Sequence, residues 1–388
     1  MKFSGDFGKL VPGWKKQTRM SRKQKIGIHN EMQRRKYIQR HNEKISRNNA
    51  LKEPPHVGHE NSFISNTKYF IINNNTAGGS YKWETDIEKY IPCTRIFNHA
   101  TFSRILSHHN NPNNIVVLIN SFLLTDFTIE NLLQLYDIYK FKVVIPIHDW
   151  YWFNVGWDYN LKHHHIYLDK NMKLPESSKK LFDICNKIIC PSNFVYEIIL
   201  KHYPSNKVEH IEWIDYNLSN LSNNYKINKN GRINIGVFVG LSECKGVEQI
   251  RYLVNRFKST IKFCIVGKNI EKYEDNYGSF IDLIKKYNIH GLLYLNKWGE
   301  TWCYGLSKGL TCGLPILYNN IGAFKERIPN TDKYIINNNN ESQFYDRNML
   351  NNNFEKLLTY IRNNEIYVND TKPKMVENSI LIDYLKSL

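Results

Sequence analysis

The stretch KWGETWCYGLSKGLTCGLP, residues 297–315, predicts a junction between a buried strand and a helix, with one acid at its centre. An apolar run over 291–296 is typical of the strand, and the pattern that follows predicts a helix ending at Gly313. We expect Glu300 in the first helical turn, where the macrodipole favours an anion and free backbone N–H groups point forward. Lys308 then lies about 12 Å further along the helix, at a rise of about 1.5 Å per residue. A ligand that reaches both positions is elongated and carries hydroxyls near the helix start.

Short apolar, β-branched runs separated by helical patterns continue on both sides of this junction. In the first half of the chain such runs predict strands at 68–73, 115–121, 142–147, 187–190 and 208–213. In the second half they predict strands at 233–239, 261–266, 292–296 and 315–318. Helices are predicted between them, among others at 129–139 and 193–202. Because nearly continuous apolar strands that alternate with helices form parallel sheets covered on both faces, the sequence predicts an α/β fold. The expected architecture is two Rossmann-like domains whose parallel sheets face each other across a cleft.

We predict that the chain divides into five parts, at 1–65, 66–216, 217–232, 233–370 and 371–388. They are a basic N-terminal extension, a first Rossmann-like domain, a polar linker, a second Rossmann-like domain and a terminal helix. The apolar residues near the end fall on one helical face, so we expect that helix to pack back on the body. Ligands of parallel sheets bind at the carboxyl ends of the strands, which places the expected site between the two domains.

Composition and charge set the background for this organisation. The chain has 388 residues, 41% of them hydrophobic and 13% aromatic, which is enough to bury two cores. Residues 1–60 hold 15 Lys and Arg against 5 Asp and Glu, and so carry +10 of the total charge of +17. That segment predicts a basic helix that binds RNA, a contact with an anionic membrane surface, or a solvated tail. The excess of Asn, including 337–340 and 351–353, indicates AT-rich codon usage rather than function.

The cysteine pattern and the absence of apolar spans indicate a cytoplasmic protein, with peripheral contact to a membrane as an alternative. The seven cysteines form no CxxC pair and no zinc-site spacing, so they are interpreted as reduced thiols. The start lacks the apolar core of a signal peptide, and no run approaches the ~20 apolar residues of a membrane span. The histidines at 163–165 are predicted to form an exposed loop, because three consecutive side chains diverge too widely to hold one ion.

Candidate binding residues in the first half follow the predicted strands. Gly78 and Gly79 precede a helix, where they allow backbone N–H groups to approach a ligand or simply permit a tight turn. His148 and Asp149 end the strand at 142–147, and four aromatic residues occupy the next five positions. This group predicts a wall that contacts a sugar, with a buried structural histidine as the alternative.

The second half opens with the loop GLSECKG, in which Gly240 follows the strand and Lys245 precedes Gly246 and the helix. A lysine beside helix N–H groups is suited to neutralising a diphosphate, although a single lysine is usually a surface residue. The loop contains neither GxxxxGKS nor GxGxxG, so ATPase and nicotinamide dehydrogenase functions are disfavoured.

Taken in chain order, these sequence elements resemble those of the retaining nucleotide-sugar glycosyltransferases of the GT-B fold, family 4 (group 1 glycosyltransferases). The resemblance runs from about residue 66 to the end and is strongest in ETWCYGLSKGLTCGLPILYNNIGAFKERI, residues 300–328. That block resembles the family's acid, its helix, the Gly-x-Pro step and the loop that ends in Glu-Arg. PSNFVYEIILKHYP at 191–204, IHDWYWF at 147–153 and AGGS at 77–80 resemble further elements of the family.

The resemblance implies a role for each matching position. It implies that Glu300 lies at the mouth of the interdomain cleft, contacts the donor sugar and supports positive charge at the anomeric carbon. Lys245 would bind the diphosphate, and His148 would face the donor sugar near the acceptor. The other donor-binding positions would be Gly240, Thr301, Trp302, Cys303, Tyr304 and Lys308, and the acceptor-side positions would be Gly78, Gly79 and Asp149.

Two positions depart from the family pattern. The family's second acid, which holds the nucleotide ribose, falls on Lys308, and a lysine cannot accept hydrogen bonds from ribose hydroxyls. Donor binding is then weakened, shifted to another nucleotide, or supported by a neighbour such as Glu326. The family's phosphate-binding arginine is also absent, because Leu241 and Ser242 stand in its place, so the loop relies on Lys245.

The function implied is transfer of a hexose, with retention, from a nucleotide diphosphate sugar to an acceptor hydroxyl on a glycan, a lipid or a protein-linked sugar. No metal and no cofactor is expected, because lysine and helix N-termini neutralise the leaving diphosphate. Two alternatives remain open at this point. One is a non-catalytic, glycosyltransferase-like binding or scaffold protein, and the other is an RNA- or membrane-surface-binding protein that acts through residues 1–60.

Overall fold

The computed structural model describes most of the chain after residue 66, within one compact unit that spans 60–388. The described ranges are 67–74, 78–122, 125–153, 173–213, 215–216, 223–238, 243–265, 277–338, 346–369, 375–376 and 379–388. The basic N-terminal extension, Gly240 and the histidines at 163–165 lie outside these ranges.

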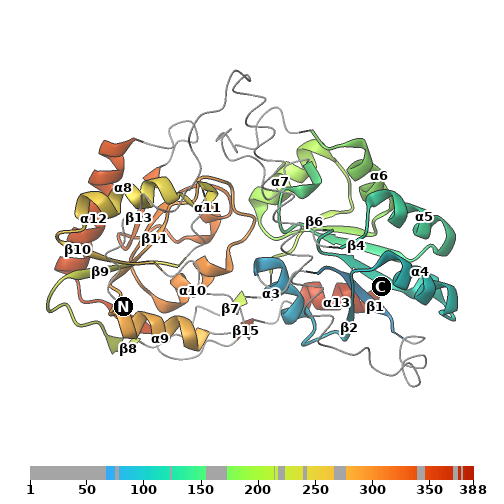
Figure 1. Ribbon diagram of the computed structural model, residues 1–388, viewed down its shortest axis with the longest axis horizontal. Helices are drawn as coiled ribbons and strands as arrows, with labels where there is room; N and C mark the ends of the chain where they lie inside the picture. Colours follow the sequence, from blue (N-terminus) through green and yellow to red (C-terminus); the bar gives the residue numbers. More distant parts are fainter. Residues whose placement is uncertain are drawn as a thin grey trace, which may run out of the picture. The chain divides into compact units, whose positions relative to one another are not determined.

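Six parallel strands form the sheet of the N-terminal half, in the order β2-β1-β3-β4-β5-β6 (Figure 1). The strands are β1 (Tyr69–Ile72), β2 (Cys93–Ile96), β3 (Val116–Ile119), β4 (Lys142–Pro146), β5 (Lys187–Cys190) and β6 (Val208–His210). The helices between them are α3 (Gly78–Ile87), α4 (His99–His108), α5 (Ile129–Tyr139), α6 (Glu176–Ile184) and α7 (Asn193–His202), with short turns at η2 (Pro112–Asn114) and η3 (Tyr151–Phe153). The strand order reverses between β1 and β3, so this half has the switch point of a Rossmann-like sheet.

Five parallel strands form the sheet of the C-terminal half, in the order β10-β9-β11-β12-β13. They are β9 (Ile233–Val237), β10 (Ile261–Ile265), β11 (Gly291–Tyr294), β12 (Ile316–Asn319) and β13 (Tyr334–Asn338). The helical elements are η4 (Glu243–Lys245), α8 (Val247–Phe257), α9 (Tyr277–Tyr287), α10 (Tyr304–Cys312), α11 (Phe324–Arg327) and α12 (Arg347–Asn363). The two parallel sheets confirm the predicted α/β class with two Rossmann-like units.

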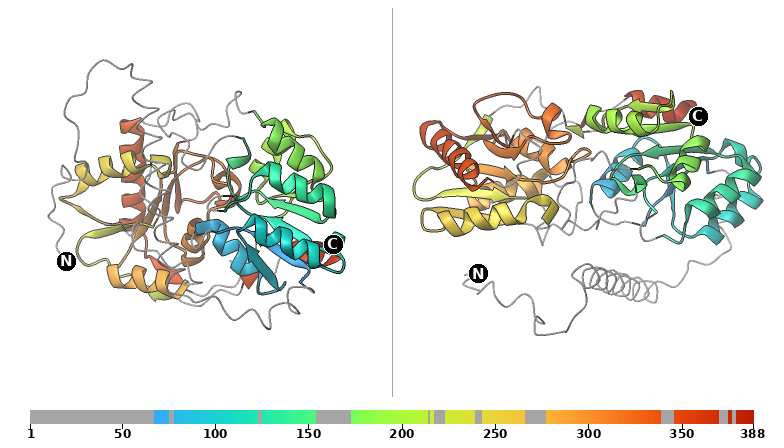
Figure 2. Two further views of the ribbon diagram at one scale, coloured as in Figure 1. Left: turned by 45° about the vertical axis from the view of Figure 1, so that its right-hand side comes forward. Right: turned by 90° about the horizontal axis from the view of Figure 1, so that it is seen from above.

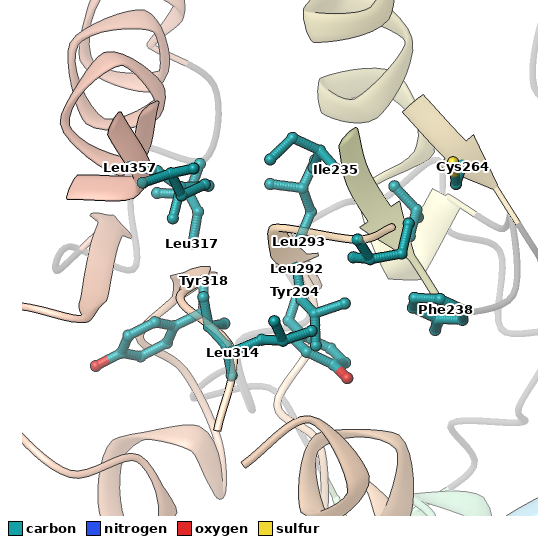
Figure 3. Packing of buried hydrophobic residues seen from close by; sticks show 14 of the residues in the cluster. Ile235, Phe238, Cys264, Leu292, Leu293, Tyr294, Leu314, Leu317, Tyr318 and Leu357 are labelled. Carbon is teal, nitrogen blue, oxygen red and sulfur yellow. The ribbon is translucent and has the colours of Figure 1, made fainter. Parts of the chain in front are cut away.

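The central strands are buried along their whole length, as their apolar runs predict. Every residue of β3, β11 and β12 is buried, because helices cover both faces of each sheet. Figure 3 shows the core of the C-terminal half, where Ile235 of β9, Leu292 of β11 and Leu317 of β12 lie with Leu357 of α12 in one cluster. These strands fix the places at which the following loops begin.

Two edge strands, β2 and β13, are absent from the predicted set. Three of the four residues of β2 are only partly buried, and one of them is Arg95, which pairs with Glu84 of α3 and with Glu88 directly after that helix. β13 lies at the other sheet's edge and consists of the mixed sequence YIINN. Both lie at sheet edges, where a strand has one neighbour and more exposure, and polar residues interrupt their apolar runs.

The segment predicted as a linker, 217–232, contains a short strand. β8 (Asn223–Lys226) pairs antiparallel with β14 (Tyr367–Asn369), and β7 (Asp215–Tyr216) pairs antiparallel with β15 (Met375–Val376). The segments through which the chain enters the C-terminal half therefore pair with those through which it leaves.

The final helix, α13 (Ser379–Ser387), packs on the sheet of the N-terminal half (Figures 1 and 2). Its side chains Leu381 and Leu385 are fully buried in one cluster with Ile71 of β1 and Val144 of β4. The Tyr69 hydroxyl also donates a hydrogen bond of 3.1 Å to the carbonyl oxygen of Leu385. The amphipathic helix predicted near the end of the sequence thus covers the first sheet rather than the second.

All seven cysteines lie in described ranges and are free thiols. Among the described helices, none combines the length and the apolar character needed to cross a membrane.

Candidate active site

Glu300 lies in the turn between β11 and α10 and not inside the helix. The helix begins at Tyr304 and ends at Cys312, and the next residue, Gly313, caps it with a left-handed φ of 73°, as predicted for the end of this helix. The expectation that Glu300 occupies the first helical turn is wrong, because Cys303 adopts φ 74° and ψ 82° and so interrupts the helical path. Glu300 therefore lies four positions before the first helical residue.

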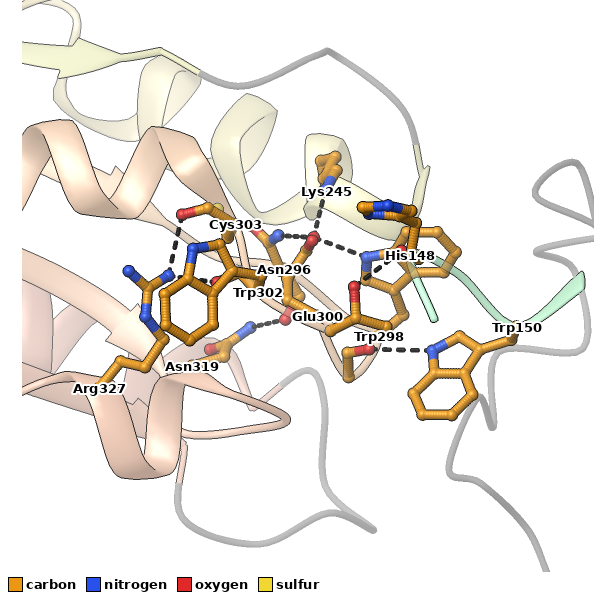
Figure 4. A network of polar contacts seen from close by, with 12 residues as sticks. His148, Trp150, Lys245, Asn296, Trp298, Glu300, Trp302, Cys303, Asn319 and Arg327 are labelled. Atoms are coloured by element: carbon orange, nitrogen blue, oxygen red, sulfur yellow. Dashed lines mark hydrogen bonds and ion pairs between the residues drawn. The ribbon is translucent and has the colours of Figure 1, made fainter. Parts of the chain in front are cut away.

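The Glu300 carboxylate has three donors on the same oxygen (Figure 4). Its Oε1 accepts a hydrogen bond of 2.6 Å from Trp298 Nε1, and further bonds from Asn296 Nδ2 and Lys245 Nζ. No hydrogen bond from the described residues reaches Oε2. The side chain is 9% exposed, so it is more enclosed than a carboxylate at the mouth of a cleft is expected to be. Polar groups rather than apolar side chains enclose Oε1, and one oxygen remains for another partner.

Lys245 provides the positive charge of this site. It ends η4, after β9 and before α8, which is the strand-loop-helix setting that the sequence predicts. Its ammonium lies 5.3 Å from the centre of the Trp298 ring and pairs with Glu300. Burial by itself lowers the pKa of Lys245, but the carboxylate of Glu300 raises it above its ordinary value. The lysine therefore stays charged at physiological pH.

Buried amides hold Asn296 at the carboxyl ends of the C-terminal strands. Asn319 donates a bond of 2.9 Å from Nδ2 to the carbonyl oxygen of Asn296, and Asn337 donates one of 2.7 Å to Asn319 Oδ1. Asn353 in turn donates one of 3.0 Å to the carbonyl oxygen of Asn337. Asn337 and Asn353 belong to the runs that the sequence attributes to codon usage alone, so at these two positions that interpretation is incomplete.

The side-chain oxygen of Asn296 is an acceptor that receives no hydrogen bond from the described residues. Its side chain is completely buried, and no described residue donates a hydrogen bond to its Oδ1. A buried acceptor without a donor is unfavourable by about 1–3 kcal/mol.

Residues of the N-terminal half contact the turn that carries Glu300. Trp150 donates a bond of 3.0 Å from Nε1 to the carbonyl oxygen of Gly299, and Thr301 donates one of 2.7 Å from Oγ1 to the carbonyl oxygen of His148. The turn between β11 and α10 is thus tied to the end of β4.

Glu326 does not lie free for a nucleotide ribose. Its carboxylate accepts hydrogen bonds from the backbone N–H groups of Asn193 at 3.0 Å and of Phe194 at 3.3 Å. These groups open α7, where the helix dipole favours a negative charge. In this structure Glu326 therefore caps a helix of the N-terminal half.

The His148 ring is held between two indoles. Its centroid lies 5.2 Å from that of Trp83 and 4.9 Å from that of Trp213. Burial lowers the pKa of His148 to about 3, so the ring is neutral at physiological pH. Its Nε2 atom is buried and has no partner among the described residues.

Asp149 has a local structural contact. Its Oδ1 accepts a bond of 2.9 Å from the backbone N–H of Tyr151 and so starts the turn η3. Burial raises the pKa of Asp149.

The start of α10 is lined by the predicted donor-binding residues. Thr301, Trp302 and Tyr304 are buried, and Lys308 is only 6% exposed in the helix. Arg327 stacks 3.7 Å from the centre of the Trp302 ring and donates bonds of 3.1 Å to the carbonyl oxygen of Cys303 and of 2.7 Å to Ser307 Oγ. Arg327 therefore stabilises the left-handed turn that precedes the helix.

The glycine turn of the N-terminal half lies against the same helix. Gly78 and Gly79 open α3, and a Cβ atom on Gly79 would be 3.7 Å from the Tyr304 ring. Lys82 of α3 places its ammonium 5.7 Å from the centre of that ring. The structure thus brings Gly79 and Tyr304 together, although 225 positions separate them in the sequence.

A second buried acid, Glu84, lies at the switch point of the N-terminal sheet. Its Oε1 accepts hydrogen bonds from the amides of Asn73, after β1, and of Asn120, after β3. Arg95 Nε of β2 lies 3.2 Å from Oε2, and the Glu84 side chain is fully buried. Burial raises the pKa of Glu84 to about 7, against the lowering effects of Asn120 and Arg95.

Glu84 is expected to make the protein less stable as the pH rises. Between its ordinary pKa of 4.5 and the folded pKa of about 7, the folded protein holds a proton that the unfolded chain has released. Stability is therefore greatest below the lower value and falls by roughly 3 kcal/mol as the pH passes the higher one. Urea unfolding at about pH 5 and about pH 8 measures this fall, and Glu84→Gln should lack it. An equal free-energy gap between wild type and variant at both pH values would contradict the assignment.

Several residues of the site receive no individual role in the sequence prediction: Trp150, Asn296, Trp298, Arg327 and, on α3 of the N-terminal half, Glu84. Asn296, Asn319 and Asn120 share one signal, an asparagine at the end of an apolar run or directly after it. The described residues contain no group of three or more His, Cys, Asp or Glu side chains that could hold a metal ion.

No protein-family model matches the sequence, and no curated protein matches it. Among solved structures the chain is similar to HepE from Anabaena in complex with UDP and glucose, at 13% identity and a TM-score of 0.49, over 76% of this chain and 93% of that one. It is also similar to the lipopolysaccharide outer core galactosyltransferase WaaB, at 10% identity and a TM-score of 0.46, over 76% and 97%. A TarM variant from S. aureus matches at 14% identity and a TM-score of 0.42, over 71% and 56%. Likeness of this degree fixes neither a substrate nor a reaction for this chain.

Proposed function

We propose that the protein is a retaining glycosyltransferase that moves a hexose from a nucleotide diphosphate sugar to an acceptor hydroxyl. The observation that carries the proposal is the pairing of Lys245 with Glu300 where β9 and β11 end, in front of α10. One charged group of each sign, a short distance apart, suits a substrate that separates charge as it reacts. The resemblance of 300–328 to the family-4 glycosyltransferases points to the same chemistry.

Breaking the bond between the anomeric carbon and the diphosphate leaves positive charge on the sugar ring and negative charge on the phosphate. Lys245, with the start of α10, favours the negative charge, and Glu300 favours the positive charge. The acceptor hydroxyl forms the new bond to the anomeric carbon on the face from which the diphosphate leaves. Its proton passes to the departing phosphate oxygen, so the step needs neither a covalent intermediate on the enzyme nor a metal ion.

The remaining residues shape the donor site under this proposal. Asn296 holds the Glu300 carboxylate through its Nδ2 donor, so that the acid stays in place beside the donor sugar. The neutral ring of His148 contributes shape but no charge on the side of the donor sugar. Gly78 and Gly79 open α3 on the acceptor side, where Gly79 lies next to Tyr304.

A release assay tests the proposal. The full-length protein is incubated with a panel of nucleotide diphosphate sugars, and free nucleoside diphosphate is measured together with the thermal shift that each donor produces. We expect release with at least one donor, and loss of both release and thermal shift in Lys245→Met. Lys262→Met serves as the matched control, because Lys262 is an exposed lysine on β10. The proposal fails if no donor is cleaved.

A binding or scaffold protein is the second candidate, and the buried Lys308 favours it. The family resemblance places a ribose-binding acid at this position, but the side chain here is a lysine that is 6% exposed. A donor that raises the melting temperature without any release of nucleoside diphosphate would support this candidate.

A further inference from the structure

We propose that Trp298 is a positioning residue that orients the Glu300 carboxylate, a role that rests on the proposed function of the site. Trp298 contacts neither the diphosphate nor the reacting sugar carbon under this proposal. It acts through the hydrogen bond of 2.6 Å that its Nε1 donates to Glu300 Oε1.

The two oxygens of the Glu300 carboxylate differ in their contacts. All three donors, Lys245, Asn296 and Trp298, meet at Oε1, and none of the described residues donates to Oε2. Three donors on one oxygen prevent the carboxylate from exchanging its two oxygens by rotation. Oε2 is thereby the oxygen that faces a bound sugar.

Binding of the nucleotide-sugar donor changes the contacts of Glu300. Lys245 is then needed at the diphosphate and can no longer serve Glu300 alone. Trp298 and Asn296 are then the two donors that serve the carboxylate alone while charge develops on the sugar. Of these two, Trp298 carries an N–H group on a rigid ring, so it loses little conformational freedom when it holds the acid.

Contacts with the N-terminal half hold the Trp298 indole in place. Trp298 belongs to the C-terminal half, but its ring packs against the hydrophobic core of the N-terminal half. The next residue, Gly299, accepts the hydrogen bond from Trp150, and a Cβ atom there would meet the Phe194 ring at 2.5 Å. The orientation of Glu300 therefore depends on contacts with both halves of the protein.

Kinetics of Trp298→Phe test the role. Phenylalanine keeps an aromatic ring against the core and beside Lys245 but removes the N–H donor. We expect kcat to fall about 10-fold while KM for the donor stays within about 2-fold, because the lost hydrogen bond acts on the reacting carboxylate and not on the diphosphate. Tyr203→Phe is the matched control, since it removes the 2.8 Å hydrogen bond from Tyr203 to the distant Asp183. A rise in KM at unchanged kcat would overturn the proposal.

A spectroscopic measurement separates this proposal from the proposed function. The indole ¹⁵N–¹H resonance of Trp298 is identified by its loss in Trp298→Phe. In Glu300→Gln we expect it to move upfield further than any other indole resonance, because the bond to a charged acceptor becomes a weaker neutral one. An unmoved resonance would refute the contact, whatever the activity. If the resonance moves but no donor is cleaved, the proposed function fails and the contact of Trp298 with Glu300 stands.

Discussion

Glu300→Gln is expected to slow the release of nucleoside diphosphate about 1000-fold, the size typical of losing a preorganised electrostatic contact in an active site. Glutamine keeps the shape of glutamate and can still accept hydrogen bonds at its oxygen. It removes the negative charge that opposes the positive charge on the sugar ring. Because Trp298 and Lys245 still have an acceptor, the expected loss lies mainly in kcat.

The measurement compares initial rates below the melting temperature of each protein, because Glu300→Gln also leaves Lys245 without its counter-charge. Glu209→Gln is the control, since Glu209 pairs with Lys187 at the edge of the N-terminal sheet. This control should retain the wild-type rate. A Glu300→Gln rate close to that of wild type would show that the carboxylate does not take part in the reaction.

Gly246→Ala is expected to destabilise the protein by about 4 kcal/mol, near the upper end for single substitutions. Gly246 adopts a φ of 74°, and a Cβ atom there would lie 1.9 Å from the carbonyl oxygen of Leu295. The left-handed backbone alone costs about 1–3 kcal/mol in a residue with a side chain, and a backbone oxygen cannot move aside as a flexible side chain can. The turn that holds Lys245 would have to shift.

Urea unfolding of Gly246→Ala and Gly231→Ala separates the two contributions. Gly231 also has a positive φ, of 102°, but nothing lies within 4 Å of its Cβ position. The stability of Gly231→Ala should fall only by the cost of the left-handed backbone, about 1–3 kcal/mol. Equal losses in the two variants would mean that the contact with Leu295 contributes nothing.

The sequence predicts the central elements of the fold because their residues carry the information locally. The patterns at 129–139 and 193–202 coincide with α5 and α7, and the apolar runs coincide with the central strands. Edge strands β2 and β13 are missed because their exposure mixes polar residues into the run. The pattern also places Glu300 inside a helix, because it does not reveal the left-handed conformation of Cys303.

The site is predicted less completely because its contacts join distant residues. Lys245 and Glu300 are separated by 55 positions, and Trp150 and Gly299 by 149. Each residue type can be singled out from the sequence, but only the parallel order of β9 and β11 places the first pair together. The contact of Trp298 with Glu300 is local, yet a tryptophan in a turn gives no signal that its N–H group serves an acid.

The packing of α13 on the first sheet has a consequence for synthesis on the ribosome. The N-terminal half emerges first, but Leu381 and Leu385, which cover Ile71 and Val144, are made after the whole of the C-terminal half. Until then an apolar patch of the nascent first sheet stays open to water and to chaperones. Maturation of the first sheet must therefore wait for the second, and translation that stops short of residue 379 leaves an aggregation-prone product.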